Sequence, residues 1–301
     1  MSRWRVAGVS SPRQVHARQM LATRSLTPQF GIAVTGIKLS SIAPGIGDEL
    51  LRLIDHHGVV IVRGQQLTPQ QFEVFSRSLG PLATHPHRHC APPSLPDVLI
   101  QSNIIENGQA IGHPDGARQW QALSTHLKSP PRAALQYAVE VPLQDGSARG
   151  DTFFANTCAA YDALDAALRQ QLIGMRAAHV SVASRKRRAM PYFPDSGLTQ
   201  IFRRGVEHPV VRLHPQTRRK CLFVNPTTTT HICGMNDGDS AALLGQLFGH
   251  IVRPEFVYRH PWQIGDVVLW DNCAVQFRTE SDYALPLRRL LYRTLLKGST
   301  A

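Results

Sequence analysis

The sequence predicts a mainly β fold with flanking helices, an α+β class, and two patterns carry this prediction. Short β-branched or apolar runs such as Val59-Val-Ile-Val62 and Val267-Val-Leu-Trp270 recur along the chain. Such runs are typical of buried strands. Fewer segments show helical spacing, as in residues 240–252, where Leu243 and Leu247 share one face.

The elements follow one another from about residue 31. We expect strands at residues 31–37, 58–63, 97–104, 132–141, 149–155, 208–215, 220–225, 256–262, 265–272 and 288–294. Helices are expected at residues 48–57, 68–79, 159–168 and 240–252. The second helix has the clearest start, because Thr68 is followed by Pro69 and then by Gln71 three positions on, which is the pattern of a capping box.

Composition limits the classes of function. The chain has 301 residues, is 43% hydrophobic and carries a formal charge of +12, so it can bury a large core and attracts anions. Its arginines are scattered and only 7% of its residues are aromatic, which favours an anionic small molecule over nucleic acid. No apolar run is long enough for a membrane span, so we expect no membrane partner.

Two further features concern organisation and compartment. Residues 1–30 are basic and are predicted to be a flexible tail, followed by a single domain at 31–301. The run Arg185–Arg188 is read as a solvated loop, with an anion gate as the alternative. The five cysteines form no Cys-x-x-Cys pair, which predicts free thiols and a cytoplasmic protein: Cys90, Cys158, Cys221, Cys233 and Cys273.

Several motifs in the same order resemble the TauD/TfdA (taurine dioxygenase-like) family of iron(II)/2-oxoglutarate enzymes. They are Trp120-Gln-Ala-Leu-Ser-Thr-His-Leu-Lys-Ser-Pro-Pro131, the Gly-Asp-Thr of 150–152 before a helix, and the hairpin of 208–225. The resemblance covers roughly residues 31–297. It implies a double-stranded β-helix, the cupin-like jelly roll.

The same resemblance locates the family's iron ligands, two His and one carboxylate. At the corresponding positions this chain has Gln121, Leu123 and Phe277. An amide and two hydrocarbon side chains do not make a ligand set for a divalent ion. The prediction is therefore a metal-independent protein with a lost 2-His-1-carboxylate triad, with neither iron nor 2-oxoglutarate turnover and no cofactor.

The anion-binding residues of the family are retained. The Arg-Arg-x-x-x-Arg frame, about a dozen positions after Phe277, identifies Arg289 and Arg293, and the Gly-Asp-Thr motif identifies Thr152. Asn103, near the end of a predicted strand, joins this set. The resemblance also implies a substrate-contacting role for His85. Binding of a 2-oxoglutarate-like carboxylate is therefore expected, although ordinary salt bridges for the two arginines remain the alternative.

Three functions are consistent with these observations. The first is an iron-free enzyme that performs a non-oxidative step on a carboxylate-bearing molecule, with His85, His126 and Tyr292 as catalytic groups. The second is a catalytically inactive pseudo-dioxygenase that binds a ligand, a paralogue or a second copy of itself. The third is an active oxygenase with a rebuilt metal site, formed by His85, His126 and His231. The sequence favours the first.

Overall fold

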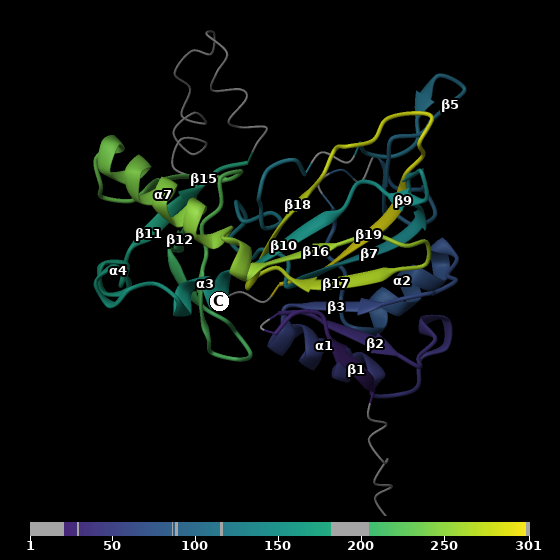
Figure 1. The fold of residues 1–301 in the computed structure, drawn as a ribbon, viewed down its shortest axis with the longest axis horizontal. Coiled ribbons are helices and arrows are strands. Elements are labelled where there is room, and N and C mark those ends of the chain that lie inside the picture. The colour runs from purple at the N-terminus through teal and green to yellow at the C-terminus, as the bar shows by residue number, and fades with distance from the viewer. Residues whose placement is uncertain are drawn as a thin grey trace, which may run out of the picture.

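The computed structural model describes residues 21–28, 30–85, 87, 90–114, 117–181 and 205–298. The run Arg185–Arg188 and residues 1–20 of the predicted tail lie outside the described residues. Within the described residues, strands predominate over helices and form several antiparallel sheets (Figure 1). The predicted β-rich jelly-roll class is thus confirmed.

A seven-stranded sheet forms the main layer. Its strand order is β1 (Ala22–Ser25), β2 (Ile32–Thr35), β3 (Val59–Val62), β17 (Val267–Asp271), β7 (Ala133–Glu140), β19 (Leu290–Leu296) and β4 (Leu99–Ser102). All neighbours are antiparallel except β2 and β3. Strand β1 lies within the range assigned to the tail, so ordered structure begins before residue 31.

A second layer faces this sheet. Strand β10 (Thr152–Asn156) pairs with β16 (Val257–His260) and β18 (Val275–Thr279). Further along, β11 (Arg176–His179) pairs with β12 (Val206–Pro209) and β15 (Thr229–Ile232). Three hairpins complete the strands: β13 (Val211–Leu213) with β14 (Lys220–Leu222), β5 (Ile105–Glu106) with β6 (Gln109–Ala110), and β8 (Leu143–Gln144) with β9 (Ser147–Ala148).

The helices form two groups. Helices α1 (Ile46–His57) and α2 (Pro69–Ser78), with the 3-10 turn η1 (Leu39–Ser41), pack on the outer face of the main sheet. Helices α3 (Thr157–Asp162), α4 (Ala166–Gln171) and α7 (Asp237–Ile251), with η3 (Pro254–Phe256), pack with β14 and β15. The predicted capping box at Thr68 and Gln71 is present.

Strand β19 divides the core because its side chains alternate between two faces. Leu291 and Leu295 join the inner cluster between the two layers. Tyr292 and Leu296 point the opposite way and pack in the outer cluster, beneath α1 and α2. The residue between Tyr292 and Thr294 is Arg293, so the strand delivers a guanidinium to the inner face.

One sequence prediction about the cysteines is wrong. Cys158 on α3 and Cys221 on β14 form a disulfide, with Cα atoms 4.1 Å apart. The packing of α3 against β14 brings these two side chains together, and the spacing of cysteines along the chain carries no sign of it. No helix in the described part of the chain has the length and apolar character that crossing a membrane requires.

Asn272 ties the segment after Trp120 to the main sheet. Its Oδ1 accepts from the Leu123 amide at 2.6 Å, and its Nδ2 donates to the carbonyls of Leu123 at 2.8 Å and Pro131 at 2.9 Å. The side chain is 1% exposed. Water therefore cannot replace these hydrogen bonds.

We predict that Asn272→Ala lowers the free energy of unfolding by roughly 3–5 kcal/mol, because it leaves three buried backbone groups without partners. Urea unfolding followed by circular dichroism measures this loss. Gln109→Ala, at an exposed position of β6, is the control and should change stability by less than about 0.5 kcal/mol. A loss below about 1 kcal/mol for Asn272→Ala would contradict the role given to these contacts.

Candidate active site

Arg293 is the most unusual charged residue of the inner face. It is 5% exposed, and its guanidinium carbon lies 5.8 Å from the ring centre of Trp270 and 5.5 Å from that of Phe277. Its Nε and Nη2 are buried, and neither has a hydrogen-bond partner among the described residues. Burial lowers the pKa of Arg293 to about 9, so the group is still charged at neutral pH. A buried cation with unpaired donors is costly unless an anion joins it.

Arg289 lies close by, at the start of the segment that leads into β19. Its Nη2 donates to the carbonyl of Gly150 at 3.1 Å and its Nη1 to the Tyr283 hydroxyl at 3.3 Å. Gly150 has φ +74°, and a Cβ there would meet the Tyr283 ring at 2.7 Å, so this approach requires glycine. Burial and then repulsion by Arg293 lower the pKa of Arg289 to about 9.

His85 supplies a neutral donor beside these cations. Its Nδ1 accepts a hydrogen bond from the His87 amide at 3.1 Å, which leaves the ring proton of the neutral imidazole on Nε2. Burial first, then the charges of Arg293, His87 and His113, lower its pKa to about 3. The imidazole is therefore uncharged at neutral pH, and it can donate to an anion without adding charge.

Two other predicted anion-site residues are committed to protein contacts. The Thr152 hydroxyl accepts from the indole Nε1 of Trp262 at 2.9 Å, and Trp262 in turn faces Arg289 at 6.0 Å. The Asn103 side chain accepts from the Arg289 amide and donates to the Leu287 carbonyl, both at 2.8 Å. Thr152 thus borders Arg289 through Trp262, whereas Asn103 fixes the backbone from which Arg289 projects.

The residues at the predicted ligand positions lie near Arg293. Gln121 and Phe277 face each other through a pair of backbone hydrogen bonds of 3.0 and 2.9 Å. Leu123 and Phe277 belong to the same buried cluster as Trp270. Of these side chains, the rings of Trp270 and Phe277 lie against the Arg293 guanidinium.

The structure does not gather the predicted catalytic groups. Tyr292 lies on the outer face of the sheet, in ring contact with Phe72 and Tyr137, because neighbouring residues of a strand point to opposite sides. His126 instead neighbours His179, whose pKa its charge lowers. His231 contacts Thr230 on β15. His85 alone of the three catalytic candidates stands beside the arginines.

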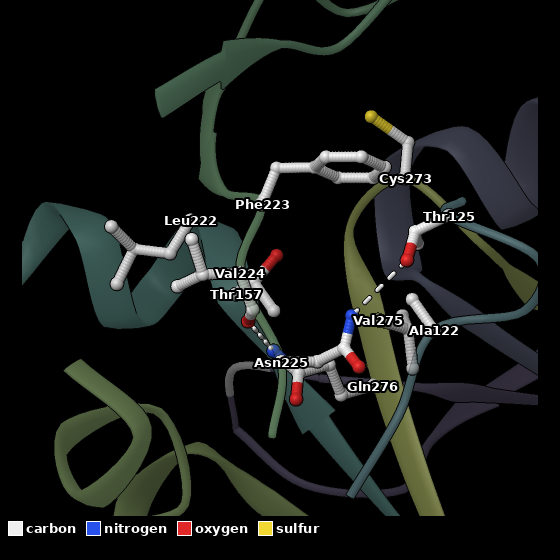
Figure 2. Close-up of a pocket in the computed structure, with 10 residues that line it drawn as sticks. All are labelled: Ala122, Thr125, Thr157, Leu222, Phe223, Val224, Asn225, Cys273, Val275 and Gln276. Atoms are coloured by element: carbon white, nitrogen blue, oxygen red, sulfur yellow. Dashed lines mark hydrogen bonds between the residues drawn. The ribbon is translucent and has the colours of Figure 1, made fainter. Parts of the chain in front are cut away.

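Sequence reasoning missed a polar network that joins Thr125 to His179 and Asn225. The Thr125 hydroxyl contacts His179 Nδ1 at 3.0 Å. It also accepts from Asn225 Nδ2 at 3.4 Å (Figure 2). A small cavity opens between Thr125, Thr157, Asn225 and Gln276. Nothing in the spacing of these residues signals their meeting, because they come from four separate segments.

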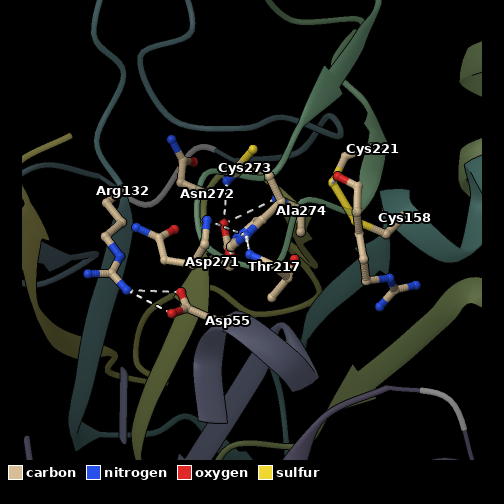
Figure 3. A network of polar contacts seen from close by, with 12 residues as sticks. Asp55, Arg132, Cys158, Thr217, Cys221, Asp271, Asn272, Cys273 and Ala274 are labelled. Carbon is tan, nitrogen blue, oxygen red and sulfur yellow. Dashed lines mark hydrogen bonds and ion pairs between the residues drawn. A yellow bond between two sulfur atoms is a disulfide. The ribbon is translucent and has the colours of Figure 1, made fainter. Parts of the chain in front are cut away.

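The sequence also missed the residues that could hold a metal ion. In the described part of the chain, the ligand atoms of Asp55, His214 and Asp271 lie within 4.8 Å of one another. Figure 3 shows Asp55 and Asp271 of this group. His214 Nε2 contacts Asp271 Oδ2, and Arg132 binds both oxygens of Asp55 at 3.0 and 2.9 Å. His214 and Asp271 are each 2% exposed. One signal existed: His214 stands in the hairpin motif of the resemblance, residues 208–225.

Comparison with known proteins identifies the family. Residues 22–295 match the family described as "Taurine catabolism dioxygenase TauD, TfdA family". The chain belongs to this family. It is 31% identical to the α-ketoglutarate-dependent 2,4-dichlorophenoxyacetate dioxygenase of Cupriavidus pinatubonensis, over 89% of this chain and 94% of that protein.

Solved structures agree. A taurine dioxygenase from Burkholderia xenovorans superposes with a TM-score of 0.74 at 29% identity, covering 93% of this chain and 91% of that one. AAD-2, crystallised with Mn(II) and N-oxalylglycine, superposes with a TM-score of 0.76 at 26% identity, covering 93% of this chain and 98% of that one.

These findings overturn the prediction of an iron-free, non-oxidative enzyme without cofactors. The relatives are named for α-ketoglutarate- (2-oxoglutarate-) dependent oxygenation, and AAD-2 holds a divalent metal. The described chain itself contains a metal-capable group, Asp55, His214 and Asp271. The prediction failed because it considered only the three positions implied by the resemblance, and a ligand group assembled from a helix, a hairpin and a strand end has no linear motif.

The buried imidazoles predict a pH dependence of stability. The pKa values of His85 and His179 are lowered from 6.5 to about 3, in both cases mainly by burial. In the unfolded chain both imidazoles take up a proton below about pH 6.5, whereas in the folded protein they stay neutral. The unfolded state thus binds more protons between pH 6.5 and 3, and stability falls as pH is lowered through that window.

We expect each of the two imidazoles to lower the free energy of unfolding by roughly 2 kcal/mol when the pH falls from 7 to 5. Denaturant unfolding at the two pH values measures the difference. His179→Gln should reduce this difference in stability by the contribution of one imidazole. His56→Gln, which removes an exposed imidazole, should leave the difference unchanged. Equal pH differences in wild type and His179→Gln would show that His179 does not carry this dependence.

Proposed function

We propose that this protein is a 2-oxoglutarate-dependent oxygenase that acts on a carboxylate-bearing small molecule. The observation that carries the proposal is the buried guanidinium of Arg293, two of whose hydrogen-bond donors have no partner in the part of the chain that the structure describes. Membership of the TauD/TfdA family and the metal-capable group formed by Asp55, His214 and Asp271 support the oxidative chemistry.

The inner face is built to receive an anion. Arg293 directs Nε and Nη2 into a region walled by Trp270 and Phe277, and His85 adds a neutral donor. Gln136, directly opposite Arg293 on β7, is hydrogen-bonded to Gln101 on β4 at 2.6 Å. Donors in a poorly hydrated site bind a carboxylate more strongly than they would in water, because its charge is not screened there.

The donor set of Asp55, His214 and Asp271 fits a divalent ion better than the positions implied by the resemblance. Two carboxylates and one imidazole are the oxygen and nitrogen ligands that iron(II) accepts, whereas Gln121, Leu123 and Phe277 offer one amide oxygen among hydrocarbon groups. A bound ferrous ion would supply the oxygen-activating chemistry. This chain's residues would hold the carboxylate, orient the substrate and exclude water.

Two contacts of the donor set must change for an ion to bind. His214 Nδ1 accepts from the amides of Gln216 at 3.3 Å and Thr217 at 3.0 Å, which keeps the imidazole proton on Nε2, the atom facing Asp271. Arg132 neutralises Asp55. Binding an ion through Nε2 would therefore require the other neutral tautomer, with its proton on Nδ1 and without the two amide hydrogen bonds, and it would loosen Arg132.

The direct test is turnover. Protein incubated with Fe(II), ascorbate, 2-oxoglutarate and a set of carboxylate substrates should form succinate in step with oxygen uptake. Elemental analysis should find about one metal ion per chain, and His214→Gln should lower that content at least about tenfold, whereas His126→Gln should not. Absence of both succinate and metal would overturn the oxygenase proposal.

A second prediction isolates the anion site. Arg293→Met should weaken carboxylate binding at least about tenfold, because it removes charge-assisted hydrogen bonds. The ligand-free variant should be as stable as wild type or up to about 2 kcal/mol more stable, because a buried cation is replaced by an apolar chain. Titration calorimetry and thermal unfolding measure the two effects.

Arg288→Met is the matched control, since Arg288 is exposed and paired with Glu140. It should bind carboxylates as wild type does. Undiminished binding in Arg293→Met would remove Arg293 from the site. Arginine-dependent binding without turnover would retain the anion site and reject the oxidative step.

A further inference from the structure

We propose that the Cys158–Cys221 disulfide positions the Asp55–His214–Asp271 group. The redox state of this cysteine pair would then control the contact between His214 and Asp271 and the affinity of the group for a metal ion. The consequence for metal binding rests on the proposed function. The consequence for the contact between His214 and Asp271 does not. Figure 3 shows the crosslink beside the polar network that contains Asp271 and Asp55.

His214 is positioned by the β13–β14 hairpin. It lies in the loop of the β13–β14 hairpin, immediately after β13, and its amide donates to the Arg219 carbonyl at 2.8 Å. Cys221 lies on the second strand of the same hairpin, opposite Arg212. This hairpin is a separate two-stranded sheet, and such a unit has little stability of its own. Any displacement of the hairpin therefore moves His214.

Asp271 is positioned by the turn between β17 and β18. Its Oδ1 accepts from the amides of Cys273 at 2.6 Å and Ala274 at 3.2 Å, which fixes the turn between β17 and β18. The Ala274 carbonyl accepts from the amide of Thr157, the first residue of α3, at 2.9 Å. Cys158 is the next residue of that helix. The turn that carries Asp271 is thus hydrogen-bonded to the element that carries Cys158.

The disulfide connects these two parts of the structure. It joins the hairpin that carries His214 to the helix that holds the turn of Asp271, across 63 residues of sequence. With the bond intact, the imidazole and the carboxylate are linked by a short covalent and hydrogen-bonded path. Once it is broken, packing and non-covalent contacts hold the hairpin to α3 and the turn, among them Arg219 with Asp162 and His214 with Asp271.

The chemistry is a thiol–disulfide exchange with an external dithiol. The dithiol transfers two electrons and two protons to the Cys158–Cys221 bond, leaving two thiols, and becomes a cyclic disulfide. Cys158 is 3% exposed and Cys221 is fully buried, so the reductant reaches the bond only after local opening. The switch should therefore respond slowly to a reductant in the folded protein.

The test compares oxidised and reduced full-length protein. Of the five cysteines, three should react with a thiol reagent in denaturant without reductant, namely Cys90, Cys233 and Cys273, and all five should react after treatment with dithiothreitol. Exchange of the His214 Nε2 proton, followed by NMR, should become at least about tenfold faster on reduction. Co(II) affinity should fall by a similar factor.

Two variants make the comparison decisive. The double variant Cys158→Ser/Cys221→Ser should have the proton-exchange rate of reduced wild type. Dithiothreitol should not change that rate. Cys233→Ser, outside the crosslink, should respond as wild type does. Five free thiols in protein purified without reductant, or proton exchange unchanged by reduction, would overturn the proposal. If neither state binds Co(II), the proposed function fails, and the thiol count and proton exchange still decide the proposal about the disulfide.

Discussion

Two buried positive charges constrain the design of this molecule. Strand β19 lies between β7 and β4 and carries Arg293 on the face covered by the second layer. A guanidinium there cannot reach bulk water, and Arg289 adds a second charge nearby. The rings of Trp270 and Phe277 offset part of the cost through cation–π contact. Within the described residues, Nε and Nη2 of Arg293 have no hydrogen-bond partner, so an anion bound there would offset the remaining cost of burying this charge.

The neighbours of this charge are arranged to leave it available to a ligand. Burial keeps His85 neutral, and because its Nδ1 accepts from the His87 amide, the remaining ring proton lies on Nε2. Gln101 and Gln136 are hydrogen-bonded to each other. Tyr283 and Gly150 contact Arg289 as neutral acceptors. A carboxylate from the protein at any of these positions would compete with the ligand for the guanidinium groups.

The sequence predicted what depends on local periodicity. The β-branched runs became strands, Thr68 and Gln71 formed their capping box, and alternation along 288–294 sent Arg293 inward. It could not predict which distant segments meet. Tyr292 was assigned to a site from which the same alternation excludes it, and the Cys158–Cys221 pair and the Asp55–His214–Asp271 group each join segments that only the tertiary structure brings together. The roles of Arg289, Thr152 and Asn103 remain predictions that ligand binding must test.

The end of β17 links the two parts of the candidate site. Trp270 lies beneath the Arg293 guanidinium, and the next residue, Asp271, contacts His214. Consecutive residues of a hydrogen-bonded strand cannot shift independently. A ligand that shifted the backbone at the end of β17 would therefore move both the Trp270 ring and the Asp271 carboxylate, although the two side chains lie on opposite faces of the strand. Because thermodynamic linkage is reciprocal, an ion held by Asp271 would change the affinity for the anion by the same factor by which the anion changes the affinity for the ion.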